Sequence, residues 1–246
     1  MSIETEADGV GLRAVGRVVR LTLDALAAAV GPGVTTAQLD RVAAGVLARH
    51  GARSAPAMVY GFPGTVLISV NDEVVHGVPG PRRIAPGDIV KLDVTLEKGG
   101  YMGDAARTVL VEPASGLARR LRACAESAFA RAVVVARAGV RVNEIGRIVE
   151  REVRRCGFAV ARGLTGHGIG RTIHEPPSVA NEYNPRQGEI LTEGLVITIE
   201  PMVVAGSGRV MTSRDGWTVR TRDGGLASHH EHTLVITRTD PVLLTA

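Results

Sequence analysis

The sequence predicts an α+β fold composed of two similar halves. Three observations lead to this prediction: apolar residues recur at helical spacing near the N-terminus, short apolar runs bounded by glycine and proline occupy much of the remaining chain, and one helix-plus-strand pattern occurs twice. With 246 residues, 45% of them hydrophobic, the chain can bury a sizeable core. Since no low-complexity segment interrupts it, we expect residues 1–246 to form a single domain.

Two helices are predicted at the N-terminus. Residues 10–29 carry leucine and valine at helical spacing, and a glycine–proline–glycine sequence at 31–33 ends the pattern. A second helix is expected to follow, with Thr36 as its N-cap and Gly51 as its stop.

The second helix has a counterpart later in the chain. Segment 33–51 matches segment 139–157 at glycine, arginine and apolar positions, at an offset of 106 residues. A second match follows, since Asp93 and Glu200 each lie six residues after a glycine across an apolar run, at an offset of 107. These matches indicate two related α+β halves with one inserted residue between them, and chance similarity is the alternative.

Short apolar runs are expected to be strands, and acidic residues occur in or beside three of them. Asp93 lies within the second run, Glu200 directly follows the third, and Glu231 shortly precedes the fourth. A carboxylate buried among apolar residues needs a cation or several hydrogen-bond donors. The four runs cover residues 66–70, 89–96, 195–199 and 234–237.

Asp93 and Asp104 flank an apparent hairpin turn. If Lys98 and Gly99 form the turn, the two carboxylates face each other directly; if Gly99 and Gly100 form it, they are diagonal neighbours on one face. Like charges so placed are destabilising unless a cation lies between them. The alternative is that Asp104 is a bend residue and Asp93 lies on a solvated strand face.

Histidine supplies a further potential ligand. Segment 166–177 is too rich in glycine for a helix, so His167 and His174 are expected on a loop or an irregular strand. A phosphate-binding loop is not expected, because neither GK[ST] nor a GxGxxG fingerprint occurs there. One imidazole and four carboxylates suit two divalent cations such as Mn, Fe(II), Co or Zn. Two such ions activate water and polarise an amide carbonyl, which predicts metal-assisted hydrolysis.

The composition argues against several other classes of protein. The only two cysteines lie far apart, so neither a disulfide framework nor a thiolate zinc site is indicated. No run reaches the roughly 18 apolar residues of a membrane helix, and the acidic start lacks the pattern of a secretory signal. We therefore expect a cytoplasmic protein whose mature chain begins at or next to Met1. The net charge of +4 comes from arginines spread along the chain, and DNA binding is not expected.

A series of motifs resembles the type I methionine aminopeptidase family, which has the pita-bread fold. The likeness covers nearly the whole chain, and the joint order and spacing are highly specific. It implies two pseudo-symmetric halves around a central antiparallel sheet, and removal of the N-terminal methionine from nascent proteins with a small second residue. The motifs are 69–71 through 76–79, 91–95, 103–104, 166–170, 174–177, 198–202, 215–219 and 231–233.

The resemblance also implies a ligand set for two divalent ions. Asp93 would chelate one ion, and Asp104 and Glu231 would bridge both ions. His167 and Glu200 would complete the ligands of the other ion.

Further roles follow from the same resemblance. Glu200 would relay a proton, His174 would hydrogen-bond the scissile carbonyl oxygen, and His76 would contact the scissile nitrogen or the next residue. Phe62 and Trp217 match positions around the methionine side-chain pocket, although either could equally be a core residue.

The chain departs from the family pattern at the pocket, which puts pocket shape in doubt but not the metal chemistry. Tyr60 stands where a histidine is common. His229 and His230 are expected at the surface. Cysteines or aromatic residues are frequent in relatives at the positions of Pro56, Val59, Leu67 and Ile173.

Other functions remain open from the sequence. The nearest rival is a proline-directed aminopeptidase or dipeptidase of the same fold, but such enzymes usually carry an added N-terminal domain for which this chain has no room. A metal-free homologue that uses the fold for binding is the second rival. The arginine-rich balance suggests a transient contact with ribosomes, and a monomer is the simplest expectation.

Overall fold

The computed structural model describes all residues from Met1 to Ala246. It contains five helices: α1 (Glu6–Ala29), α2 (Thr36–His50), α3 (Ala55–Tyr60), α4 (Gly116–Val135) and α5 (Val142–Arg155). The strands are β1 (Arg53–Ser54), β2 (Leu67–Val70), β3 (Glu73–Val75), β4 (Ile89–Lys98), β5 (Tyr101–Leu110), β6 (Ala159–Val160), β7 (Thr165–Gly168), β8 (Glu175–Ala180), β9 (Val196–Ile199), β10 (Met202–Val204), β11 (Val210–Thr212), β12 (Val219–Thr221), β13 (Ala227–His229), β14 (Glu231–Val235) and β15 (Val242–Leu243).

A nine-stranded sheet forms the centre of the molecule. Its main order is β1-β4-β5-β14-β9-β7-β8, with β2 paired to β4 and β15 to β14. The pairs of this sheet are antiparallel, as the family resemblance implied. Two three-stranded sheets, β13-β10-β6 and β11-β12-β3, complete the strand arrangement. Strands from both halves of the chain therefore meet in one sheet.

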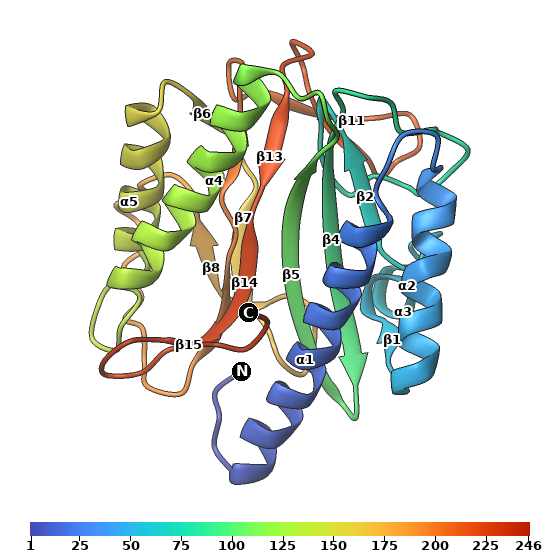
Figure 1. The fold of residues 1–246 in the computed structure, drawn as a ribbon. Helices are drawn as coiled ribbons and strands as arrows, with labels where there is room; N and C mark the ends of the chain where they lie inside the picture. Colours follow the sequence, from blue (N-terminus) through green and yellow to red (C-terminus); the bar gives the residue numbers. More distant parts are fainter.

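The long helices cover one face of the sheet in two pairs. In Figure 1, α1 and α2 lie over the half that contains β4 and β5, and α4 and α5 lie over the other half. Each pair has its own core cluster, of 27 and 21 buried residues. Leu12 and Leu39 belong to the first cluster, whereas Leu121 and Ile145 belong to the second. The helix predicted from the repeat after position 139 is α5, whereas α4 was not predicted from the sequence.

The ends of the first two helices differ slightly from the prediction. Helix α1 begins at Glu6 rather than near residue 10, because Thr5 and Asp8 form a capping box. The prediction of Thr36 as the N-cap of α2 is wrong. Thr35 is the N-cap, since its hydroxyl accepts from the Gln38 amide at 3.1 Å, while Gln38 accepts from the Thr35 amide. None of the five helices combines the length and the apolar character that a membrane span requires.

The hairpin of β4 and β5 decides how its two aspartates lie. The turn consists of Gly99 and Gly100, both with positive φ (60° and 83°), since Lys98 pairs with Tyr101. Asp93 consequently faces Ala106 and lies diagonally to Asp104. This is the second of the two registers considered from the sequence. The alternation of side chains puts both carboxylates on the sheet face opposite the helices.

Candidate active site

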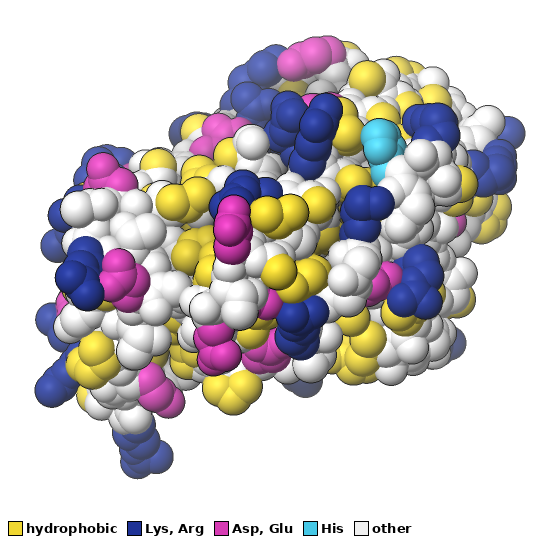
Figure 2. All heavy atoms as spheres, turned by 90° about the horizontal axis from the view of Figure 1, so that it is seen from below, with side chains coloured by type: hydrophobic (Ala, Val, Ile, Leu, Met, Phe, Trp, Pro, Cys, Tyr) yellow, Lys and Arg dark blue, Asp and Glu magenta, His cyan; other side chains and the backbone are white.

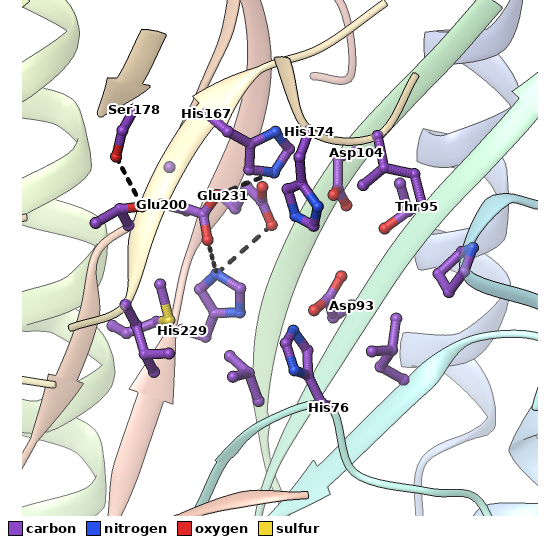
Figure 3. Close-up of a pocket in the computed structure, with 18 of the residues that line it drawn as sticks. His76, Asp93, Thr95, Asp104, His167, His174, Ser178, Glu200, His229 and Glu231 are labelled. Atoms are coloured by element: carbon purple, nitrogen blue, oxygen red, sulfur yellow. Dashed lines mark hydrogen bonds and ion pairs between the residues drawn. The ribbon is translucent and has the colours of Figure 1, made fainter. Parts of the chain in front are cut away.

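Five buried ligand-type side chains converge on the sheet face opposite the four long helices. They come from five neighbouring strands: Asp93 from β4, Asp104 from β5, Glu231 from the start of β14, His167 from β7, and Glu200 from the residue directly after β9. Figure 3 shows the imidazole and carboxylates pointing toward one centre. The sequence prediction named all five.

A cavity of about 690 Å³ opens onto this group. Its lining includes every residue that the sequence predicted for the site, and the volume lies in the range of small-molecule sites. Those residues are Phe62, His76, Asp93, Asp104, His167, His174, Glu200, Trp217 and Glu231.

Mutual repulsion and burial make the acidic cluster unfavourable in its ionised form. Burial raises the pKa of Asp104 to about 6. Burial, together with the charge of Asp104, raises the pKa of Glu200 to about 8. The pKa values of Asp93 and Glu231 are raised for the same reasons. Four carboxylates so placed need positive charge to be ionised at neutral pH.

Two observations show that divalent cations fit this cluster. Asp104 Oδ1 and Glu231 Oε1 are buried without a hydrogen-bond partner, which is costly for carboxylate oxygens. Ligand atoms of Asp104, His167 and Glu231 also lie within 4.8 Å of one another, as do those of Asp93, Glu231 and His229. Oxygen donors with imidazole match the ligand preference of borderline divalent metals.

His167 is held in an orientation suited to ligation. It lies at an irregularity between β7 and β8, which confirms the expected irregular strand. Its Nδ1 lies 2.9 Å from the Gly168 carbonyl oxygen, so Nδ1 carries the proton and Nε2 is left as the acceptor. Nε2 lies 3.5 Å from Glu200 Oε1. Burial lowers the pKa of His167 to about 4, which keeps the ring neutral.

The remaining two predicted histidines lie at the mouth of the cavity. His76 precedes Gly77 in a tight segment and has a positive φ of 59°. His174 is on the loop before β8, where its Nδ1 lies 2.5 Å from the Tyr60 hydroxyl of α3. Figure 3 shows both rings turned toward the carboxylates. The prediction from sequence did not foresee the contact with Tyr60.

An apolar wall adjoins the carboxylates. Phe62 and Trp217 meet edge to face with ring centroids 5.3 Å apart, and both line the cavity. Of the family departures, Tyr60, Leu67 and Ile173 line it together with Pro56, whereas Val59 is exposed and does not. Four of these five positions therefore border the pocket.

The surface placement predicted for His229 is wrong. The side chain is 1% exposed and lines the cavity beside Glu231 and Glu200. His230 is half-buried, and its ring packs on Phe129 with centroids 5.0 Å apart. The missed signal was the two-residue alternation of a strand, which puts residues 229 and 231 on one face and residue 230 on the other.

Comparison with known proteins agrees with this geometry. The model of metallopeptidase family M24 matches residues 10–238, and the chain belongs to this family. "Methionine aminopeptidase 2" of Bacillus subtilis (strain 168) is 39% identical over 247 residues, covering 100% of this chain and 99% of the relative. "Methionine aminopeptidase" of Clostridium perfringens (strain 13 / Type A) is 42% identical over 234 residues, covering 95% and 94%.

Solved structures confirm the pita-bread fold. Methionine aminopeptidase from Rickettsia prowazekii matches with a TM-score of 0.96 at 35% identity and covers 100% of both chains. A prolidase from Pyrococcus furiosus matches with a TM-score of 0.81 at 22% identity, covering 99% of this chain and 65% of the prolidase. At that identity the second likeness shows the fold alone. Membership in a metallopeptidase family and the observed acid–histidine cluster together imply divalent metal ions.

Proposed function

We propose that the protein removes the N-terminal methionine from nascent polypeptides, as a methionine aminopeptidase of type I with two divalent ions. The observation that carries this proposal is a cluster of buried carboxylates and imidazole beside an apolar pocket inside one cavity. Curated relatives named methionine aminopeptidase match over nearly their whole length, which supports the same activity.

The five ligand residues would hold the ions in the arrangement that the family resemblance implies. Asp93 would contribute to one ion, His167 and Glu200 would contribute to the other, and Asp104 and Glu231 would be shared. When bound, the ions supply a Lewis acid for the scissile carbonyl and lower the pKa of water. A metal identity among Co, Mn, Fe(II) and Zn fits this mixed oxygen and nitrogen set.

The protein's own groups position the substrate and move protons. Glu200 accepts a proton at its carboxylate from the attacking water and returns it to the leaving nitrogen. When the Tyr60 hydroxyl donates to Nδ1 of His174, the ring proton is on Nε2, which can donate to the carbonyl oxygen as charge develops there. His76 contacts the scissile nitrogen or the residue after it.

The apolar wall accounts for preference at the first residue. Phe62 and Trp217 offer aromatic edges and faces to an unbranched thioether side chain, a contact favourable for methionine. Both rings border the cavity that contains the carboxylates, so a methionine side chain seated there would place its own carbonyl near the cluster.

The direct test is release of methionine from the peptide Met-Ala-Ser. Chelated protein should release none, and Mn(II), Fe(II), Co(II) or Zn(II), added back separately, should restore release with at least one of them. An X-Pro peptide is the matched comparison: preferential cleavage of X-Pro would assign the proline-directed rival instead. If the protein bound none of these ions at any metal concentration tested, the result would support the metal-free alternative and contradict the proposal.

The proposed activity also determines where the protein acts. Nascent chains emerge from cytoplasmic ribosomes, so we place it in the cytoplasm as a monomer with a transient ribosome contact. On the face that Figure 2 shows, Lys and Arg side chains are interspersed with acidic and hydrophobic ones. A contact based on such spread charge should be weak and salt-sensitive, and co-sedimentation with ribosomes at two salt concentrations measures it.

A further inference from the structure

His229 is a buried titratable group at the cavity to which the proposed mechanism gives no role. Its side chain is 1% exposed, and neither Nδ1 nor Nε2 has a hydrogen-bond partner. A buried imidazole without partners loses the hydrogen bonds that water would provide, at a cost of about 1–3 kcal/mol. Such a group calls for a ligand that the protein itself does not supply.

The distance from His229 to Glu231 is longer than a good hydrogen bond and close to the separation of two ligands of one cation, whereas the distance to Glu200 is longer than either. Its Nε2 lies 3.5 Å from Glu231 Oε2 and 4.0 Å from Glu200 Oε2. Figure 3 shows the ring turned toward both carboxylates. A good hydrogen bond to oxygen is about 2.7–3.2 Å long. Two atoms bound to one ion at about 2.1 Å each, about 90–110° apart, are separated by about 3.0–3.4 Å.

His229 also completes a second group of potential ligands. Ligand atoms of Asp93, Glu231 and His229 lie within 4.8 Å of one another. The other such group contains Asp104, His167 and Glu231, so the two groups share Glu231 and contain one histidine each. The pattern is that of two neighbouring ions, each with its own imidazole.

We propose that His229 is a ligand, through Nε2, of the ion that Asp93 and Glu231 hold. This inference rests on the proposed function, because it concerns the same pair of ions. It adds a nitrogen donor to an ion that would otherwise have only carboxylate ligands from the protein. A nitrogen donor favours Fe(II), Co(II) and Zn(II) over Mn(II) and Mg(II) at that position.

The first test counts metal-bound histidines in the full-length protein loaded with Co(II). The N–H proton of a histidine bound to paramagnetic Co(II) resonates far outside the normal proton range and disappears in D₂O. Wild type should show two such resonances, from His167 and His229, and His229→Gln should show one. His230→Gln is the matched control, since its ring packs on Phe129, and it should retain both.

The second test measures ion affinity by calorimetric titration of the demetallated protein with Co(II). His229→Gln should weaken one of two binding events at least tenfold and leave the other unchanged, because loss of a direct ligand affects its own ion first. His230→Gln should match wild type. Circular dichroism confirms that each variant is folded; should His229→Gln not fold, the resonance count of the wild type alone decides the question.

The outcomes separate this inference from the proposed function. Wild type that releases methionine and binds two ions, but shows a single shifted N–H resonance or an unchanged affinity in His229→Gln, would overturn the role of His229 only. Wild type that binds no ion, or releases no methionine when loaded, would overturn the proposed function and this inference with it.

Discussion

The contact between Tyr60 and His174 shows how one side chain can set the proton position of another. Tyr60 is half-exposed on α3, and its hydroxyl lies 2.5 Å from His174 Nδ1 on a loop far away in sequence. A donor at Nδ1 leaves the ring proton on Nε2, which faces the cavity.

Tyr60→Phe should lower kcat while leaving KM nearly unchanged. The substitution removes the hydroxyl and keeps the ring, so the loss is one hydrogen bond, worth about 0.5–1.5 kcal/mol or roughly a two- to twelvefold decrease in rate. Steady-state kinetics on Met-Ala-Ser measures both constants. Tyr183→Phe is the control, because Tyr183 stacks on Arg147 outside the cavity. An unchanged kcat in Tyr60→Phe would show that the hydroxyl does not position His174.

At the residue scale, the sequence indicated the acidic residues that line the site but not every partner of the site. Asp93 and Glu200 stood out because a carboxylate inside or at the end of an apolar run demands compensation. Tyr60 gave no such signal, because its partner is 114 residues away and only the folded chain brings them together. His229 was predictable in principle from strand alternation, yet its neighbouring histidines concealed it.

At the scale of elements, α1 approaches the C-terminal segment so closely that only glycine fits between them. A Cβ built on Gly16 would lie 2.2 Å from the Leu244 carbonyl oxygen, a backbone atom that cannot move aside as a flexible side chain can. Gly45, on α2, would place a Cβ no nearer than 3.5 Å to any atom, the terminal nitrogen of Arg49. A methyl group therefore clashes with the backbone at residue 16 but has room at residue 45.

Gly16→Ala should destabilise the protein by about 1–3 kcal/mol, since the helix must shift away from residue 244. Gly45→Ala should stabilise it by about 0.5–1 kcal/mol, because alanine is the better helix former and meets no clash. Urea unfolding of both variants and wild type measures the differences. Equal effects of the two substitutions would show that the packing of α1 tolerates a methyl group at residue 16.

At this scale, the sequence could not predict the N-cap residue of α2 or the register of the β4–β5 hairpin. Apolar periodicity located α1 and α2, but it does not distinguish Thr35 from Thr36 as a cap; only the reciprocal bonds of Thr35 and Gln38 do. Likewise, two hairpin turns were compatible with the glycines at 99 and 100. Tertiary pairing decided between them, whereas both registers kept the two aspartates on one face.

At the scale of the whole molecule, the buried charge cluster links stability to pH and metal. The pKa of Asp104 is raised from 3.8 to about 6, and that of Glu200 from 4.5 to about 8. The folded protein therefore holds these protons more tightly than the unfolded chain does. Their contribution to stability is complete below about pH 4 and is lost as pH rises through 6 and 8.

Removal of metal should accordingly destabilise the protein more at pH 8 than at pH 5. Each ion present at a hundred times its Kd should add about 2.7 kcal/mol, which corresponds to a rise in Tm of roughly 5–10 °C per ion for a chain of this size. Scanning calorimetry of chelated and Co(II)-loaded protein at both pH values measures this. His167→Ala is the control and should show a smaller rise. A metal effect that is larger at pH 5 would contradict the assigned pKa directions.

The two related halves were the most informative prediction at this scale, because the repeat in the sequence reports an architecture rather than an element. What the repeat did not reveal is the pair of strands at which the two halves join. Asp93 and Asp104 lie on the first half, whereas His167, Glu200 and Glu231 lie on the second, and β5 joins β14 between them. Only the sheet order shows that the donors become neighbours across this pair of strands.

The position of this junction, between β5 and β14, determines how the protein would lose its metal. Since each half brings only part of the donor set, a slight parting of β5 from β14 would release ions while every helix stayed intact. Metal content would then decline before circular dichroism registers any damage, so bound metal serves as an early gauge of whether the two halves are correctly docked.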